Sequence, residues 1–340
     1  MPRWFVRCSL AAATIVALAT TGEVVLRARA SAFRADLEAT AGWSPDHACN
    51  QADPRLVYRG VENRCGANSQ GFVDAEHAFE KPRGVFRVVV IGDSIALGHP
   101  NAYRHSFAHV LERLLREACS DREVEVVVLA TVGYSSEQEL VLLEEDASRY
   151  HPDLVLWSYC LNDPAHPYRH DPNGQLGRYY HRPQSYLADF FAEKIFFARE
   201  SWRAQTRRCP SEFHAFLHCA YADEVAATFA ALGRWQAQTH VPVVVAIHPL
   251  IEQNRPPERY SLSDLHQHLV DLARANGLVG IDLLPAYQGH SWQEVGLGYR
   301  DRWFDCYHPN QLGHEILGRY LQRELIAEGL VACASPQGES

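Results

Sequence analysis

From residue 86 onward, short apolar runs typical of buried strands alternate with stretches of helical periodicity. The predicted strands cover residues 86–91, 123–129, 153–159, 241–247 and 278–282, and the predicted helices cover 104–118, 135–150, 224–238, 263–276 and 310–328. Strands that alternate with helices require right-handed crossovers and a parallel sheet covered on both faces. We therefore predict an α/β fold, a three-layer α/β/α sandwich with a central parallel sheet.

The chain divides into segments of different character. We expect an N-terminal membrane anchor or signal peptide over 1–30, an irregular approach segment over 31–84, the α/β domain over 85–330 and a short tail over 331–340. Within the domain the alternation stops over 163–220, where turn-forming residues give way to aromatic ones. This insertion is interpreted either as a lid or substrate wall over the active site, or as a small satellite core that packs on the sheet.

The first thirty residues carry an export or anchoring signal. Arg3 and Arg7 precede an uncharged stretch from Cys8 to Gly22. That stretch is short for a spanning helix, which needs roughly 20 apolar residues, but long for the core of a signal peptide. Residues 24–26 can extend it into an uncleaved anchor, while residues 28–30 offer a weak cleavage site. An amphipathic cytosolic arm is a further alternative.

Cysteine usage and charge limit the location and the partners. Eight cysteines follow Cys8, an even number compatible with disulfides in an exported chain, and the closest pairs are Cys49 with Cys65 and Cys209 with Cys219. Several of them can instead be buried thiols. The formal net charge is -9 without a long basic run, which excludes nucleic acid as an expected partner.

No cofactor or metal is expected. The chain has no Cys-x-x-Cys pair, so a structural zinc site is not predicted. His166, His170 and His181 cluster in the insertion, where they are interpreted as polar loop residues in preference to a metal site.

Two short strings carry the side chains of a nucleophilic acyl-transfer site. Ser94 follows the strand over 86–91 in the string Gly92-Asp-Ser94, and a serine in such a strand-to-helix turn is exposed at the edge of the sheet. Asp305 and His308 precede the last helix, three residues apart on a predicted loop, where the carboxylate can orient the imidazole toward a nucleophile. Taken alone, Ser94 could be a turn or N-cap residue, and Asp305 a helix cap.

Two further positions suit donors to an oxyanion. Gly133 follows the second strand and offers a backbone N–H that a substrate can approach, and Asn162 follows the third strand and offers a carboxamide. Each could equally be an ordinary turn residue. Preorganised donors of this kind are worth about 2.7–4 kcal/mol each at a transition state.

Taken together, these blocks resemble the SGNH or GDSL-type serine esterases and acylhydrolases. The resemblance covers about residues 86 to 328, with blocks at Gly92-Asp-Ser94, Gly133, Asn162-Asp163 and Asp305-x-x-His308. It implies a flavodoxin-like sheet and a triad of Ser94 as nucleophile, His308 as general base and acid, and Asp305 as its orienting carboxylate. It also implies an oxyanion hole from the N–H groups of Ser94 and Gly133 and the side chain of Asn162.

The third block departs from the family pattern. The family usually has glycine two residues before the asparagine, whereas this chain has Cys160 there. The local turn can therefore differ without removal of the donor at Asn162.

The upstream part is similar to membrane-anchored bacterial members of the same family. These carry a Glu-x-x-Leu-Arg pattern after the anchor and a later Asn-x-x-Gly-Phe pattern, which here read Glu23 to Arg27 and Asn68 to Phe72. The resemblance implies a catalytic domain in the periplasm or outside the cell.

The sequence thus predicts a Ser-His-Asp esterase or acylhydrolase that acts on a small-molecule, lipid or glycan ester, with the membrane contacted through the N-terminal segment. An alternative is an O-acyltransferase or deacetylase that acts on an extracytoplasmic polysaccharide or glycolipid. A third hypothesis, a catalytically silent binding module, requires a broken triad position, and none is broken. Acyl length, the alcohol portion, connectivity of the disulfides and oligomeric state are left open.

Overall fold

The computed structural model describes residues 3–41, 49–119, 122–170, 176–300 and 303–333. Its centre is a parallel sheet with the strand order β4-β3-β5-β6-β7. The strands are β3 (Val85–Gly92), β4 (Glu123–Ala130), β5 (Leu154–Tyr159), β6 (Val243–Ile247) and β7 (Val279–Asp282). Numbered along the sheet this order is 2-1-3-4-5, the flavodoxin-like arrangement, in which ligands bind where the order reverses, between β3 and β5.

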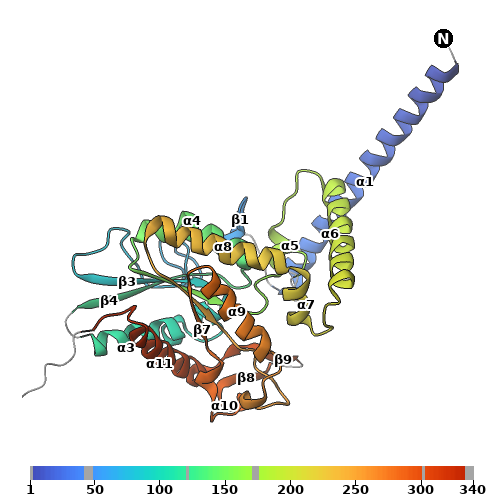
Figure 1. The fold of residues 1–340 in the computed structure, drawn as a ribbon. Coiled ribbons are helices and arrows are strands. Elements are labelled where there is room, and N and C mark those ends of the chain that lie inside the picture. Colours follow the sequence, from blue (N-terminus) through green and yellow to red (C-terminus); the bar gives the residue numbers. More distant parts are fainter. Residues whose placement is uncertain (1–2, 42–48, 120–121, 171–175, 301–302, 334–340) are drawn as a thin grey trace, which may run out of the picture.

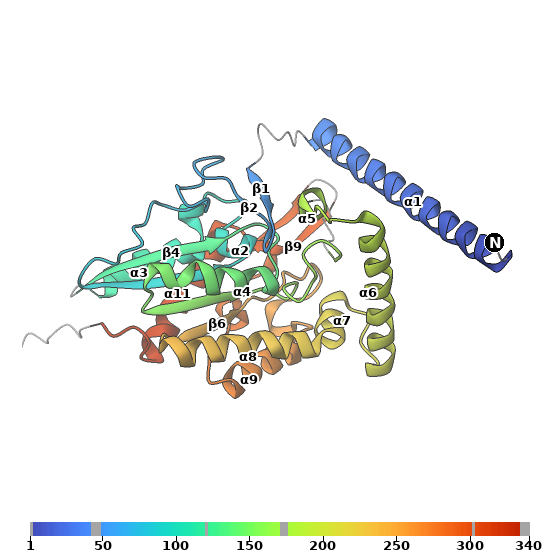
Figure 2. The ribbon, with the colours of Figure 1, turned by 90° about the horizontal axis from the view of Figure 1, so that it is seen from above.

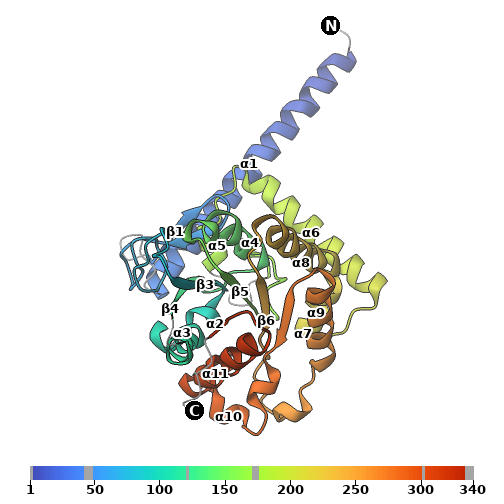
Figure 3. The ribbon, with the colours of Figure 1, turned by 60° about the vertical axis from the view of Figure 1, so that its left-hand side comes forward.

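Helices cover both faces of the sheet, as the three-layer prediction requires (Figure 3). One face carries α3 (Phe107–Ala118) and α11 (Gln311–Ala327), which pack on each other, and the opposite face carries α4 (Ser136–Glu145) and α8 (Ala222–Thr239). Helix α9 (Ser263–Ala275) packs on β6 and β7. Every residue of β5 and β6 is buried, because a strand covered on both faces must be apolar throughout.

The predicted helix over 135–150 is interrupted. Helix α4 ends at Glu145, and a 3-10 turn over Ala147–Tyr150 follows it. Further 3-10 turns cover Tyr103–His105, Pro257–Arg259 and Leu284–Tyr287. Two short helices are α2 (Ser94–Leu97) and α10 (Trp292–Val295).

The N-terminal helix is longer than the sequence indicated. Helix α1 covers Arg3–Ala41, past the expected boundary at residue 30, and two antiparallel strands follow it, β1 (Asn50–Asp53) and β2 (Val57–Gly60). The continuation is explained by the run of Ala, Arg, Leu and Glu without Gly or Pro as far as Ala41. By length and composition, the segment Arg7–Ala39 could cross a membrane. An 18-residue window within it has a mean hydropathy of 1.7 and contains no buried residue.

The insertion forms three helices, α5 (Leu176–Tyr180), α6 (Tyr186–Arg207) and α7 (Phe213–Ala220). Leu217, Ala220 and Tyr221 form a small cluster of their own, against which Phe196 packs. This cluster is the satellite core that the sequence offered as one alternative. Helix α6 lies at the outer edge of the molecule beside α1 (Figures 1 and 2).

Three disulfides are present in the described residues. Those between Cys49 and Cys65 and between Cys209 and Cys219 confirm the two pairs expected from proximity in the sequence. The third joins Cys119 to Cys333 and ties the end of α3 to the C-terminal segment. Proximity could not predict it, because the two cysteines are 214 residues apart.

One part of the fold was predicted wrongly. Asp305 and His308 lie on a strand, β9 (Trp303–Pro309), and not on a loop. This strand pairs antiparallel with β8 (Gly296–Arg300). The backbone groups of the segment are thus paired with the strand that directly precedes it in the chain. The bulged pairing leaves no regular alternation of polar and apolar residues that would indicate a strand.

Candidate active site

The turn after β3 is tightly constrained. A Cβ atom at Gly92 would lie 2.9 Å from Cβ of Ser158 on the adjacent strand, so only glycine fits. The carboxylate of Asp93 accepts a hydrogen bond from the backbone N–H of Ile95 (2.8 Å) and caps α2. Ser94, the first residue of this helix, is thereby fixed at the carboxyl end of β3 with 7% of its surface exposed.

Ser94, His308 and Asp305 form a continuous chain of hydrogen bonds. The Nε2 atom of His308 lies 2.8 Å from Oγ of Ser94, and its Nδ1 atom lies 2.9 and 3.0 Å from the two carboxylate oxygens of Asp305. An ionised carboxylate only accepts, so Nδ1 carries the proton and Nε2 is the acceptor for the serine hydroxyl. The structure thus brings together the three side chains that the sequence placed in two distant strings.

A distortion of β9 turns Asp305 and His308 to the same side. Residues three apart on a regular strand point to opposite faces. Here Gly296 pairs with Pro309 and Gly298 with Asp305, so three residues of β9 oppose one residue of β8. One oxygen of Asp305 accepts hydrogen bonds from the backbone N–H groups of Tyr307 and His308, both at 3.0 Å, and holds this bulge.

Asp305 is the ionised member of the site. Its side chain is fully buried, which by itself disfavours the charge. The hydrogen bonds from the ring and backbone of His308 and from the backbone of Tyr307 outweigh this burial and hold the pKa of Asp305 below its ordinary value. Asp305 is therefore a carboxylate wherever the domain is folded near neutral pH.

Further buried carboxyl groups lie near Asp93, the residue before Ser94. Asp93, Glu139 and Asp163 are all buried. Burial raises the pKa of Asp93 to about 6, against the opposing effect of the Ile95 N–H and the charge of His308. Burial and mutual repulsion raise the pKa values of Glu139 and Asp163 well above the ordinary range. The burial of Glu139 was not predicted, because the helical pattern over 135–150 does not indicate it.

Asp93 and Asp163 have structural roles. Both bind loop backbone, since Asp163 accepts from the N–H of Cys160 at 2.8 Å. Neither is the acid that orients His308, which is Asp305.

Gly133 and Asn162 follow the two strands that flank β3. Because β4 and β5 pair with β3 on either side, the turns that carry Gly133 and Asn162 flank Ser94 at the same edge of the sheet. Gly133 has φ 76°, a left-handed conformation that favours glycine, and the residue is exposed. Among the described residues, the carboxamide oxygen of Asn162 has no hydrogen-bond partner.

Two other histidines border the site and were not predicted from the sequence. The ring of His99 meets the ring of His308 edge-on at 5.5 Å between centroids. His214, on α7, has its Nε2 atom 3.0 Å from the hydroxyl of Tyr307 and its Nδ1 atom 2.8 Å from the carboxylate of Glu212. The insertion therefore contacts, through α7, the residue next to His308. No local spacing signals this contact, because Tyr307 is 93 residues from His214.

The histidines of the insertion are engaged in local pairs. His170 contacts Glu200, and His181 stacks on Tyr168 and lies 3.2 Å from Asp189. Within the described ranges, no group of three or more His, Cys, Asp or Glu residues is placed to hold a metal ion. The arrangement at Ser94 needs none for chemistry of its own, since a serine hydroxyl, a basic imidazole nitrogen and a buried carboxylate are sufficient to activate a nucleophile.

Comparison with known proteins identifies the family. The sequence model of the GDSL-like lipase/acylhydrolase family matches residues 90–316, more than half of the chain. No curated protein matches.

Three solved structures illustrate the similarity. One is LAE5, an alpha/beta hydrolase enzyme from the metagenome of Lake Arreo, Spain, which is 18% identical in sequence. The match covers 73% of this chain and 96% of LAE5, with a TM-score of 0.46. The lipase/acylhydrolase from Enterococcus faecalis is 18% identical, with coverage of 72% and 96% and a TM-score of 0.42. Axe2, an acetylxylan esterase from Geobacillus stearothermophilus, is 19% identical, with coverage of 71% and 94% and a TM-score of 0.45. By the match of the family model, the chain belongs to the GDSL-like lipase/acylhydrolase family and is a carboxylic ester hydrolase.

Proposed function

We propose that the protein hydrolyses carboxylic esters through an acyl-enzyme at Ser94. His308 accepts the hydroxyl proton as Oγ attacks the ester carbonyl carbon, and it donates that proton to the departing alcohol. Water then attacks the acyl-enzyme by the same route, and Ser94 regains its proton. The observation that carries the proposal is the unbroken hydrogen-bonded chain from Ser94 through His308 to Asp305.

Asp305 acts in this reaction by fixing the ring of His308. Its hydrogen bond to Nδ1 keeps the proton on that nitrogen and leaves Nε2 basic toward Ser94. Its negative charge stabilises the imidazolium that forms when the serine is deprotonated. Asn at position 305 could accept at one atom only and would permit the wrong tautomer.

The oxyanion is assigned to three donors in the proposal. These are the backbone N–H groups of Ser94 and Gly133 and the carboxamide of Asn162. Their placement just after three adjacent strands, with Ser94 after the middle one, supports the assignment. Loss of one such donor costs about 2.7–4 kcal/mol at the transition state, or roughly 100–1,000-fold in kcat.

Covalent labelling tests the nucleophile. A fluorophosphonate probe should label the wild-type chain and a Ser148→Ala control, whose serine is exposed and distant from the site, but not Ser94→Ala. Asp305→Asn should remain folded and lose about 10⁴-fold in kcat on an activated ester. Equal labelling of Ser94→Ala would refute the assignment, and transfer of the acyl group to an added sugar in preference to water would replace hydrolysis by acyl transfer.

The proposal extends to the location of the domain, which faces an oxidising compartment such as the periplasm and is anchored by α1. Support comes from the three disulfides, which persist outside the cytoplasm, and from the exposed apolar surface of α1. Alkylation of cysteines in whole cells before lysis tests it. Six cysteines should react only after reduction, and reactivity of all nine without reductant would contradict the location.

A further inference from the structure

Helix α6 carries an apolar surface that no part of the described chain covers. Phe191, Ile195 and Trp202 are 57%, 53% and 66% exposed, and within α6, which the structure describes throughout, no residue is buried. Their separations of four and seven residues place the three side chains on one face of the helix. We call this set the outer stripe. A contiguous stripe of large apolar side chains on a surface helix marks a contact with a partner or a membrane.

The opposite face of α6 holds the helix to the domain. Glu200 contacts His170 and Tyr221, and Phe196 stacks on Tyr221. Glu200 follows Phe191 by nine positions, or two and a half turns at about 3.6 residues per turn, so the two side chains point in opposite directions. The outer stripe therefore faces away from the protein.

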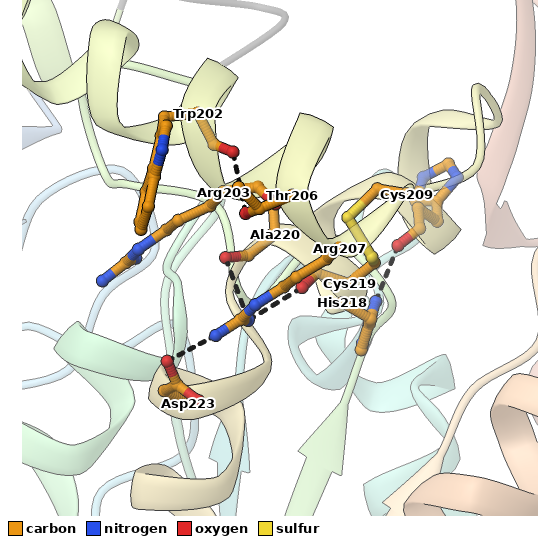
Figure 4. Close-up of a disulfide and its surroundings, with 10 residues drawn as sticks. Trp202, Arg203, Thr206, Arg207, Cys209, His218, Cys219, Ala220 and Asp223 are labelled. Atoms are coloured by element: carbon orange, nitrogen blue, oxygen red, sulfur yellow. Dashed lines mark hydrogen bonds and ion pairs between the residues drawn. A yellow bond between two sulfur atoms is a disulfide. The ribbon is translucent and has the colours of Figure 1, made fainter.

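The end of α6 is fixed in the same orientation. Arg207 donates to the carbonyl of Cys219 (3.0 Å) and pairs with Asp223 (2.5 Å), and the disulfide between Cys209 and Cys219 closes the connection to α7 (Figure 4). Rotation of α6 that would bury the stripe against the domain would break these contacts.

The start of α6 is held by the membrane-anchor helix. The carboxylate of Glu23 accepts hydrogen bonds from the N–H groups of Tyr186 (3.1 Å) and Leu187 (2.8 Å) and from the hydroxyl of Ser185 (2.9 Å). It thus satisfies donors at the first turn of α6 and places a negative charge at the positive end of that helix. Arg27 lies over the Tyr186 ring at 5.1 Å.

These contacts fix the level of α6 along α1. Glu23 is the first charged residue after the uncharged stretch from Cys8 to Gly22, and residues 24–26 extend that stretch by about one turn. Glu23 therefore lies within about one turn of the point where the apolar span leaves the membrane. A Cβ at Gly22 would lie only 3.2 Å from the side chain of Leu187. Helix α6 therefore begins at the depth where the lipid headgroups begin.

The direction of α6 suits a membrane surface. In Figures 1 and 2, α6 runs crosswise to α1, and the N-terminal part of α1 projects beyond the domain. A bilayer that receives this projecting part has its surface crosswise to α1, and hence along α6. The exposed cations Lys194 and Arg199 flank the outer stripe, an arrangement typical of helices that lie in the headgroup region.

We propose that α6 lies flat in the lipid headgroup region beside the emerging α1, with Phe191, Ile195 and Trp202 inserted at the membrane interface. This inference rests on the proposed anchoring by α1. The two helices then hold the catalytic domain in one orientation on the membrane, where α1 alone would leave it free to tilt. The inference requires that α1 is retained in the mature protein, because cleavage after residue 30 would remove Glu23 and Arg27.

Depth-dependent fluorescence quenching tests the proposal on the full chain. The protein is reconstituted in vesicles of phosphatidylglycerol and phosphatidylcholine whose acyl chains carry bromine either near the headgroup or near the bilayer centre. Trp202→Phe should lose part of the fluorescence that shallow bromine quenches, because Trp202 is at the interface. The control Trp235→Phe, on α8 in the body of the domain, should keep the whole quenchable fraction.

Carbonate extraction and one double variant separate the possible outcomes. Alkaline carbonate extraction of the wild type tests anchoring alone: release from the vesicles would refute the anchor and with it the basis of the inference. Retention together with identical quenching in the wild type and Trp202→Phe would refute only the role of α6. In Phe191→Glu/Ile195→Glu, Trp202 quenching should fall while carbonate resistance persists. A dimer in detergent that this double variant abolishes, without Trp202 quenching in vesicles, would assign the stripe to a second copy and overturn the proposal.

Discussion

Asp74 is the buried centre of a charge cluster whose effect on stability depends on pH. Its side chain is fully buried, with Nε2 of His109 at 2.9 Å and Nε2 of His77 at 3.3 Å. Nδ1 of His77 also lies 2.6 Å from Glu125. Burial disfavours the charge on each ring, but the carboxylates outweigh it and raise the pKa of both His77 and His109 to about 9.

The sign and size of the effect follow from proton linkage. Both rings have a pKa of 6.5 without the fold, so each binds its proton more tightly in the folded state. The resulting stability is fully present below pH 6.5 and is lost as the pH rises through about 9. A shift from 6.5 to about 9 corresponds to about 3 kcal/mol for one ring at 1.36 kcal/mol per unit. The two rings share Asp74, so their joint contribution is smaller than twice this value.

Urea unfolding of the full chain in detergent at about pH 6.5 and about pH 9.5 measures the effect. Between these values the wild type should lose more unfolding free energy than Asp74→Asn, in which the rings lack their shared anion. Asp271→Asn, which changes an exposed aspartate on α9, should behave as the wild type does. Equal losses in the wild type and Asp74→Asn would refute the reasoning.

Three more outcomes are expected. Gly92→Ala places a methyl group 2.9 Å from Cβ of Ser158 and should lower the unfolding free energy by about 1–3 kcal/mol; an unchanged melting temperature would show that the turn can relax. Glu139 has a pKa raised well above its ordinary value by burial and by the charge of Asp93, so the wild type must bind a proton on folding. Glu139→Gln should therefore gain stability relative to the wild type as the pH rises from about 5 to about 8, and a constant difference in denaturation free energy would contradict this. Tyr307→Phe breaks the contact with α7 but leaves the triad, so steady-state kinetics should show a changed KM with kcat within about tenfold; a collapse of kcat at constant KM would place the hydroxyl in the chemistry.

Where local pattern decides structure, the sequence was a sufficient guide. The β-branched runs that become β3 to β6 are buried on both faces, so their apolar character is visible without knowledge of the fold. Ser94 could be placed because it directly follows such a run. The family match over residues 90–316 confirms the resemblance read from the four blocks.

Where irregular or distant contacts decide structure, the sequence was insufficient. The strand that carries His308 pairs with the neighbouring β8, but its bulge, held by the carboxylate of Asp305, interrupts the alternation that would indicate a strand. The burial of Glu139 depends on the loop at Asp163, whose carbonyl accepts the N–H of Ser136 at the start of α4. Such placements result from tertiary packing that overrides local preference.

Differences in environment explain how several buried carboxyl groups can lie near one imidazole. In the proposed reaction His308 becomes positively charged for a moment and requires one fixed anion. Asp305 supplies it, because three hydrogen-bond donors from Tyr307 and His308 keep it ionised despite burial. Asp93 is closer to the nucleophile in sequence, but burial raises its pKa to about 6 and its hydrogen bond goes to the helix that carries Ser94. The environment of each carboxyl group, and not its residue type or its distance along the chain from Ser94, therefore determines which one orients the base.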